Sequence, residues 1–185
     1  FSDILMLPYG LGQSVDFEKN FGPKLGKLEI DNILKVTEDD FTNKLKPVYK
    51  LINIIAEDSL IKNKDLFGFV GAPWTLLIYM INQISPKKEL KKNFFNDEVL
   101  IKKLISIIVK FLKVHIKNQV NSGATIIQIF DSWAGLADEK KLDLLVYEPT
   151  LELVNFVKSL NVPVVCFPRE IKDYKNYVDN VKPDV

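Results

Sequence analysis

The sequence predicts an α/β protein whose strands run parallel and are joined by helical crossovers. Apolar runs of strand length at 66–70, 125–130 and 162–167 alternate with segments of helical periodicity. Such alternation is typical of a doubly wound sheet or of a (β/α)8 barrel. No G-x-G-x-x-G motif follows any of these runs, which disfavours a dinucleotide-binding fold.

At the start of the chain we expect a strand followed by a loop. Residues 1–7 form an apolar run that contains one charge, Asp3, and are predicted as a strand. Residues 8–23 are rich in glycine and are predicted as a loop, and residues 28–36 are expected to be extended or irregular.

Two long helices are predicted from apolar residues at helical spacing. The first begins at Asp39 or Asp40, either of which can cap it, and ends near Ile55. Pro47 lies about two turns in, so this helix is expected either to begin later or to kink there. The second is capped by Asp97 and stops at Gly123, with lysines on the side opposite its apolar residues.

Two stretches suggest where a functional site lies. In LFGFVGAPWTLLIYM, residues 66–80, a strand ends at a turn and Pro73 begins a helix that is apolar on nearly every side. In ATIIQIFDSWAG, residues 124–135, a strand ends at the polar turn Asp131–Ser132. Two strands that each end in a tight, partly polar turn predict one site at their carboxyl ends.

The last part of the chain continues the alternation. Helices are predicted over 139–146 and 149–160, the second beginning at Pro149. A strand over 162–167 and a short helix over 174–181 follow, and the final residues resemble the start of another strand.

Composition excludes several classes of protein. The 185 residues can bury a substantial core, and we treat them as one domain, 1–185. The 25 basic and 24 acidic residues leave a net charge of +1, which gives no support to nucleic-acid or membrane-surface binding. No apolar run approaches the ~18 residues of a spanning helix. The single cysteine excludes an internal disulfide and suits a reducing compartment.

Three segments resemble the signature segments of the uroporphyrinogen decarboxylase family, enzymes of haem biosynthesis. They are FSDILMLPYGLGQSVDFEKNFGP at 1–23, GFVGAPWTLLIYM at 68–80 and QIFDSWAG at 128–135. All three occur in the family's order. The family's proteins are longer than this chain, which lacks an initiator Met and the family's arginine-rich N-terminal segment, so the resemblance implies an internal fragment.

The resemblance carries expectations about fold and activity. It implies a TIM (β/α)8 barrel, of which this chain supplies parallel strands two to five and the start of strand six. It implies removal of four acetate carboxyls from uroporphyrinogen III to give coproporphyrinogen III, by a homodimer in the cytoplasm. No cofactor is implied, because the substrate's own pyrrole, once protonated, accepts the electrons. The isolated fragment is expected to be inactive.

The resemblance also assigns five site residues. Asp3 and Tyr79 are the implied catalytic residues, and both are also implied to bind substrate. Ser132 is implied to bind a substrate carboxylate, Gly71 to permit close approach and Phe69 to provide an apolar wall. From the residues alone, each has an ordinary structural alternative, such as a helix cap for Ser132 or core packing for Tyr79.

Two other classes of protein stay open. One is a corrinoid methyltransferase of the same superfamily, which uses zinc, and the other is a non-catalytic fragment. With one histidine, His115, and one cysteine, Cys166, a Cys/His zinc site is disfavoured, and no metal is expected. His115 is interpreted as a structural or surface residue and Cys166 as a buried strand residue. Glu170 departs from the family, which usually has glycine there.

Overall fold

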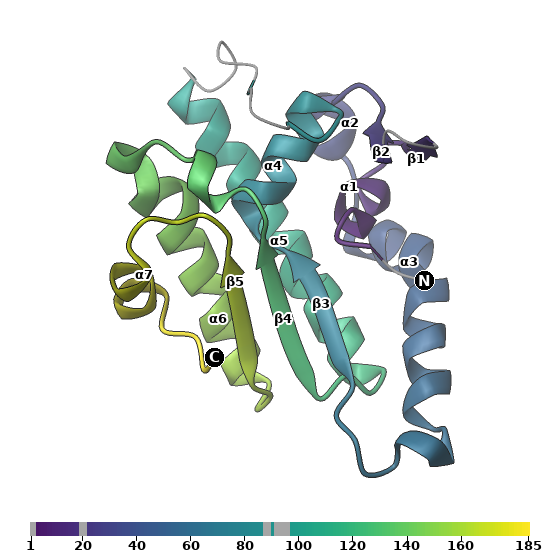
Figure 1. The fold of residues 1–185 in the computed structure, drawn as a ribbon. Helices are drawn as coiled ribbons and strands as arrows, with labels where there is room; N and C mark the ends of the chain where they lie inside the picture. Colours follow the sequence, from purple (N-terminus) through teal and green to yellow (C-terminus); the bar gives the residue numbers. More distant parts are fainter. Residues whose placement is uncertain (1–2, 19–21, 87–89, 91–96) are drawn as a thin grey trace.

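A parallel sheet of three strands forms the centre of the structure (Figure 1). The computed structural model describes residues 3–18, 22–86, 90 and 97–185. The strand order is β3–β4–β5, with bounds β3 Phe67–Gly71, β4 Ile126–Asp131 and β5 Val164–Pro168. The predicted α/β class and the three predicted runs are confirmed. The described strands form an open sheet, and no closed barrel is seen among them.

Helices occupy most of the segments between strands. They are α1 Met6–Gly10, α2 Ile30–Ile33, α3 Glu38–Ala56, α4 Pro73–Asn82, α5 Glu98–Asn121, α6 Glu148–Ser159 and α7 Tyr174–Val181. Shorter helical turns are η1 Ser59–Ile61, η3 Ala134–Leu136, η4 Glu139–Lys141 and the π-helix η5 Asp143–Tyr147. The predicted start of α4 at Pro73, the Asp97 cap of α5 and the bounds of α7 are confirmed.

The strand predicted over 1–7 is wrong in its described part; residues 1–2 lie outside the described residues. Asp3 precedes a turn in which its Oδ1 accepts a hydrogen bond from the Leu5 backbone N–H at 2.8 Å. The turn leads into α1, and Leu5 and Leu7 are fully buried there. A short apolar run fits a buried helical turn as well as a strand. Here the Asp3 carboxylate bonds the backbone two residues on, which favours a turn over an extended strand.

Two segments expected to be irregular carry regular structure. The loop predicted over 8–23 contains the end of α1 and most of an antiparallel hairpin, β1 Val15–Glu18 and β2 Gly22–Leu25; residues 19–21 lie outside the described residues. Within 28–36 lies α2. These elements are short, so their pairing depends on neighbours that local sequence does not reveal.

The cap of α3 differs from the prediction. Thr37 is the N-cap, and its hydroxyl accepts a hydrogen bond from the Asp40 backbone N–H at 3.1 Å. The Asp40 side chain bonds back to Thr37, which completes a capping box. Asp40 therefore acts as the third helical residue and not as the cap itself.

The two helices predicted over 139–146 and 149–160 are continuous in the structure. The π-helix η5 runs directly into α6, and Pro149 lies in the first turn of α6. Pro149 directly follows the π-helix, where the regular i→i−4 hydrogen bonds are already interrupted, so its missing N–H is tolerated. Pro149 therefore does not separate two helices.

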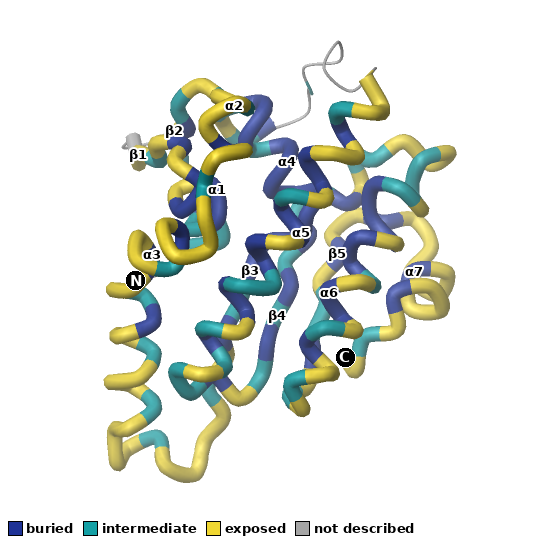
Figure 2. The backbone as a smooth tube through the Cα atoms, turned by 180° about the vertical axis from the view of Figure 1, so that it is seen from behind, coloured by how far each residue is buried: buried dark blue, intermediate teal, exposed yellow. Residues whose placement is uncertain are grey.

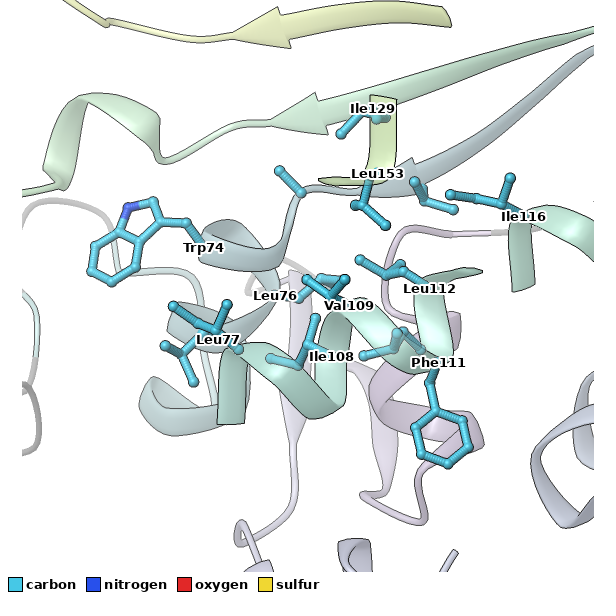
Figure 3. Close-up of a cluster of buried hydrophobic side chains, with 14 of the residues drawn as sticks. Trp74, Leu76, Leu77, Ile108, Val109, Phe111, Leu112, Ile116, Ile129 and Leu153 are labelled. Carbon is cyan, nitrogen blue, oxygen red and sulfur yellow. The ribbon is translucent and has the colours of Figure 1, made fainter. Parts of the chain in front are cut away.

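The core lies between the sheet and the helices on one of its faces. Figure 3 shows Leu76 of α4 and Val109 and Leu112 of α5 on the side of the sheet where Ile129 of β4 and Leu153 of α6 lie. All five are buried, and burial of each such side chain stabilises the fold by about 1.5–3 kcal/mol. Figure 2 shows α4 buried along its length, whereas the C-terminal half of α3 is mostly exposed.

The opposite face of the sheet carries aromatic side chains. Along β4, Ile127, Ile129 and Asp131 are buried against the helices, while the alternate residues are only half-buried. No described helix crosses this second face in Figure 1. Phe67 and Phe167 are about half exposed there, at 49% and 50%.

A helical side chain hydrogen-bonds the backbone of the edge strand β3. The Gln119 amide of α5 donates to the Phe69 carbonyl at 3.1 Å and accepts from the Phe69 N–H at 3.0 Å. A side chain on Gly68 would meet Gln119 Oε1 at 2.8 Å, so glycine is required for this approach. Satisfying edge groups in this way reduces the tendency of a sheet edge to pair with other chains.

His115 of α5 is buried against α3, as its structural interpretation predicts. The Tyr49 hydroxyl lies 3.0 Å from His115 Nδ1. Burial lowers the pKa of His115 to about 4, because the interior disfavours the charged imidazolium. His115 is therefore neutral in the folded protein near neutral pH.

His115 should make folding sensitive to mild acid. An unfolded His115 protonates near pH 6.5 and the folded one near pH 4, so the unfolded state binds more protons between these values. The free energy of unfolding should fall by about 3 kcal/mol as pH falls through this range. In His115→Gln, urea unfolding across the same range should lack this contribution; an unchanged slope in the variant would contradict the assignment.

Candidate active site at the carboxyl ends of the strands

The carboxyl ends of β3, β4 and β5 lie at one edge of the sheet because the three strands are parallel. The register pairs Gly71 with Phe130, and Phe130 with Phe167. α4 begins just beyond β3, and the Ala72 N–H donates to the Phe130 carbonyl at 2.8 Å. The predicted convergence of the two signature turns at this edge is therefore present in the fold.

Gly71 lies where the N-terminal segment meets the end of β3. A Cβ atom on Gly71 would come within 2.9 Å of Leu76 and 3.3 Å of the Ile4 side chain. Glycine is therefore needed for this close approach. Because Asp3 is the neighbour of Ile4, the first described residues lie at the same edge of the sheet as the two signature turns.

Tyr79 and the turn that carries Ser132 are brought together. The rings of Tyr79 and Trp133 meet edge to face, with centroids 6.2 Å apart. Ser132 directly precedes Trp133, and both Ser132 and Tyr79 are half-buried. A helix after β3 and a turn after β4 thus supply two hydroxyl-bearing residues to one region.

Phe69 belongs to a row of phenylalanines across the second face of the sheet. Its ring meets Phe130 edge to face at 6.0 Å, and Phe130 meets Phe167 in the same way at 6.3 Å. The sequence interpretation did not include Phe130 and Phe167. Their positions at the ends of predicted strands were a usable signal, but the register that aligns the three rings was not visible in the sequence.

A carboxyl group is buried near these turns: Asp131 is 1% exposed. Its Oδ1 accepts a hydrogen bond from the Thr75 hydroxyl at 2.6 Å. Burial raises the pKa of Asp131 to about 7, although hydrogen bonds from Thr75 and the Trp133 backbone oppose the shift. Asp131 and Thr75 were missed as interacting residues; the alternation Ile127, Ile129, Asp131 was a signal that this carboxyl is buried.

Cys166 lies in β5, as predicted, but it is half-buried and not fully buried as expected, and it lies beside Tyr177. Burial raises the pKa of its thiol to about 12, and a hydrogen bond with Tyr177 only partly offsets this. A thiol with a raised pKa is a poor nucleophile and a poor metal ligand at neutral pH. Among the described residues, no group of three or more His, Cys, Asp or Glu side chains is arranged to hold a metal ion.

The loops after β4 and β5 are tied together. The Gly135 N–H donates to the Arg169 carbonyl at 3.1 Å, and the Arg169 N–H donates to the Asp131 carbonyl at 3.0 Å. A pocket of about 640 Å³ lies between these loops, lined by segments 134–147 and 170–176. None of the five predicted site residues lines it, so this pocket is separate from the predicted site.

Glu170 adopts a backbone conformation that favours glycine. Its φ is +62°, in the left-handed region, and its side chain pairs with the exposed Arg169 guanidinium at 3.0 Å. This explains in physical terms why glycine suits the position. The ion pair is exposed to solvent, so it contributes little to stability.

The fold and these contacts define an α/β protein with a candidate site at the carboxyl ends of parallel strands. The family model described as "Uroporphyrinogen decarboxylase (URO-D)" matches residues 1–184. The chain belongs to the uroporphyrinogen decarboxylase family.

Its relatives include curated uroporphyrinogen decarboxylases from two bacteria. The one from Rickettsia bellii is 35% identical, covering 100% of this chain and 56% of that protein. The one from Campylobacter jejuni is 35% identical, covering 97% of this chain and 54% of that protein. The chain therefore spans little more than half the length of the curated relatives it matches.

A solved structure shares the fold. A methyltransferase from Methanosarcina mazei superposes with a TM-score of 0.69 at 17% identity, covering 96% of this chain and 52% of that one. At this identity the match supports the fold alone. No described helix has both the length and the apolar character needed to cross a membrane.

Replacing Glu170 with glycine should stabilise the protein. A left-handed conformation costs a non-glycine residue roughly 1–2 kcal/mol, and the extra freedom of glycine in the unfolded chain offsets part of that gain. We expect Glu170→Gly to raise the free energy of unfolding by up to about 1 kcal/mol, measured by urea denaturation. Glu170→Ala, which keeps the strain and loses the ion pair, is the matched control; equal stability of the two variants would contradict the explanation.

Proposed function

We propose that the full-length protein is a uroporphyrinogen decarboxylase, which removes the four acetate carboxyls of uroporphyrinogen III to give coproporphyrinogen III. Membership of the family supports this activity. The observation that carries the proposal is the meeting of two signature turns at one sheet edge, where Trp133 packs on Tyr79. This places the Ser132 turn beside the helix of Tyr79, as a shared substrate site requires.

The proposed residue roles follow from the chemistry of each group. Asp3 contacts the pyrrole centre, where its negative charge steadies a protonated ring. Tyr79 and Ser132 donate hydrogen bonds to substrate carboxylates, and the Tyr79 hydroxyl can take part in proton delivery. Phe69 offers an apolar wall, and Gly71 permits close approach of the chain segments that surround the macrocycle.

The reaction needs no external electron acceptor. A proton adds to the ring carbon next to the one that bears the acetate group, and the ring becomes a cation with positive charge at the acetate-bearing carbon. The carbon–carbon bond to the carboxylate breaks, its electron pair enters the ring and CO2 leaves. A second proton then takes the place of the lost carboxyl, and loss of the ring proton restores the pyrrole. The enzyme supplies proton transfer and charge stabilisation, for which hydroxyl and carboxylate side chains suffice.

A corrinoid methyltransferase of the same superfamily, which the sequence left open, is the second candidate. The two activities differ in their need for zinc. Dialysis of the full-length protein against a chelator should leave decarboxylation of uroporphyrinogen III intact. Absence of decarboxylation together with a zinc-dependent methyl transfer would favour the second candidate. The third interpretation is a non-catalytic fragment, which predicts that neither decarboxylation nor methyl transfer is found.

We also propose that the full-length protein is a homodimer in the cytoplasm. The family resemblance supports both assignments. Light scattering coupled to size-exclusion chromatography tests the dimer directly, and a monomeric mass at micromolar concentration would contradict it.

Asp3 should be essential for turnover in the full-length protein. Asp3→Asn keeps an oxygen that can accept the Leu5 N–H but removes the negative charge. We expect Asp3→Asn to lower kcat by about 10²–10³-fold and Asp3→Ala to abolish turnover almost completely, measured as coproporphyrinogen formed. Asp31→Ala, which removes an exposed carboxylate in α2, is the control and should stay close to wild type. Near-normal turnover by Asp3→Ala would remove Asp3 from the mechanism.

Residues 1–185 alone should not decarboxylate uroporphyrinogen, even if they fold. The substrate's carboxylates need cationic partners, and an anion buried without a partner is strongly disfavoured. The only arginine in these residues, Arg169, pairs with Glu170. The test expresses 1–185 and the full-length protein side by side and compares their specific activities. Comparable activities would contradict the assignment of the main carboxylate partners to the rest of the protein.

A further inference from the structure

One buried hydroxyl links α4 to the turn after β4. Thr75 is fully buried, and its Oγ1 accepts a hydrogen bond from the Trp133 backbone N–H at 3.0 Å. The same hydroxyl lies 2.6 Å from Asp131 Oδ1. Because a backbone N–H can only donate, the hydroxyl proton is left to point at the carboxyl oxygen. Thr75 thus bonds to both neighbours of Ser132: it accepts from the Trp133 N–H and donates to the Asp131 carboxyl group.

Trp133 is held by three separate contacts with α4. Its N–H bonds to Thr75, its carbonyl accepts from the Trp74 indole Nε1–H at 2.9 Å, and its ring packs on Tyr79. Thr75 and Tyr79 are four residues apart and therefore lie on the same face of the helix. The position of Ser132 relative to Tyr79 is consequently set by the contacts of its two neighbours, Asp131 and Trp133.

We infer that Thr75 is a positioning residue whose hydroxyl sets the placement of Ser132 against Tyr79. The inference rests on the proposed function, because it gives these two residues a shared substrate. Thr75 itself is fully buried and touches no substrate in this assignment.

Loss of the hydroxyl would act on the geometry of the turn. Without it, buried Asp131 Oδ1 loses the Thr75 donor and the half-buried Trp133 N–H loses the Thr75 acceptor, and Asp131 Oδ2 already has no partner among the described residues. A buried polar group without a partner is strongly disfavoured. The turn can relieve this by moving away from α4, which carries Ser132 with it. A displacement of about 1 Å can lower the rate by about a hundredfold.

The chain offers a matched control for this substitution. Thr150 is also a fully buried helical threonine, in α6, and its hydroxyl has no hydrogen-bond partner among the described residues. Thr75→Val and Thr150→Val remove the same atoms from buried sites and keep the shape of the side chain. Thr75→Ser keeps the hydroxyl and removes only the methyl group.

The experiment uses the full-length protein and two readouts. The first is kcat and KM for uroporphyrinogen III, and the second is the ¹⁹F resonance of Trp133 after labelling with 5-fluorotryptophan, assigned with Trp133→Phe. We expect Thr75→Val to lower kcat/KM about a hundredfold and to shift the Trp133 resonance. Thr75→Ser should restore both readouts, and Thr150→Val should leave both at wild-type values. If Thr75→Val fails to fold, Thr75→Ala takes its place with the same expected direction.

Two results would overturn the inference. One is wild-type kcat/KM with an unmoved Trp133 resonance in Thr75→Val. The other is an equal loss in Thr75→Ser, because the methyl group and not the hydroxyl would then hold the turn. If the wild-type protein does not turn over uroporphyrinogen III, the proposed function fails separately. The resonance then decides: a shift in Thr75→Val that Thr75→Ser reverses supports the positioning role, and no shift refutes it.

Discussion

The parallel hydrogen-bonded register of β3, β4 and β5 is the constraint on which the rest of the structure depends. It aligns Gly71, Phe130 and Phe167, so the three strands end at one edge of the sheet. Every turn that follows a strand therefore emerges on the same side, although the turns are far apart in the sequence. The candidate site exists because of this alignment, and none of its residues would meet the others without it.

The two faces of the sheet differ in what covers them. On one face, α4, α5 and α6 cover the strands and bury a continuous aliphatic core. On the other, three phenylalanine rings meet edge to face, and Phe167 is half exposed. Alternation along each strand sends successive side chains to opposite faces, so one strand contributes to both. In β4 this places Asp131 on the buried face, where its carboxyl is held by Thr75.

Buried polar groups in this protein fall into two kinds. Gln119, Thr75 and the Tyr49–His115 pair have partners, and each joins a helix to another element. The Thr150 hydroxyl has no partner among the described residues and joins nothing. A buried polar side chain that is hydrogen-bonded to another element restricts the relative position of the two elements, because a shift would leave a donor or an acceptor unpaired. The hydroxyl of Thr75 has this effect at the candidate site.

The sequence by itself determined the α/β class, the three strands, the start of α4 at Pro73, the cap of α5 and the bounds of α7, because these depend on local periodicity and on residues that begin or cap helices. It also indicated the two turns where the candidate site lies. Only the tertiary structure decided that residues 3–7 form a turn and the start of a helix, because a short apolar run suits either state and its choice depends on what Leu5 and Leu7 pack against. The register of the phenylalanine row and the hydrogen bonds of Thr75 were likewise decided there. Both join residues separated by about thirty to sixty positions, and no local pattern specifies which distant partners will meet.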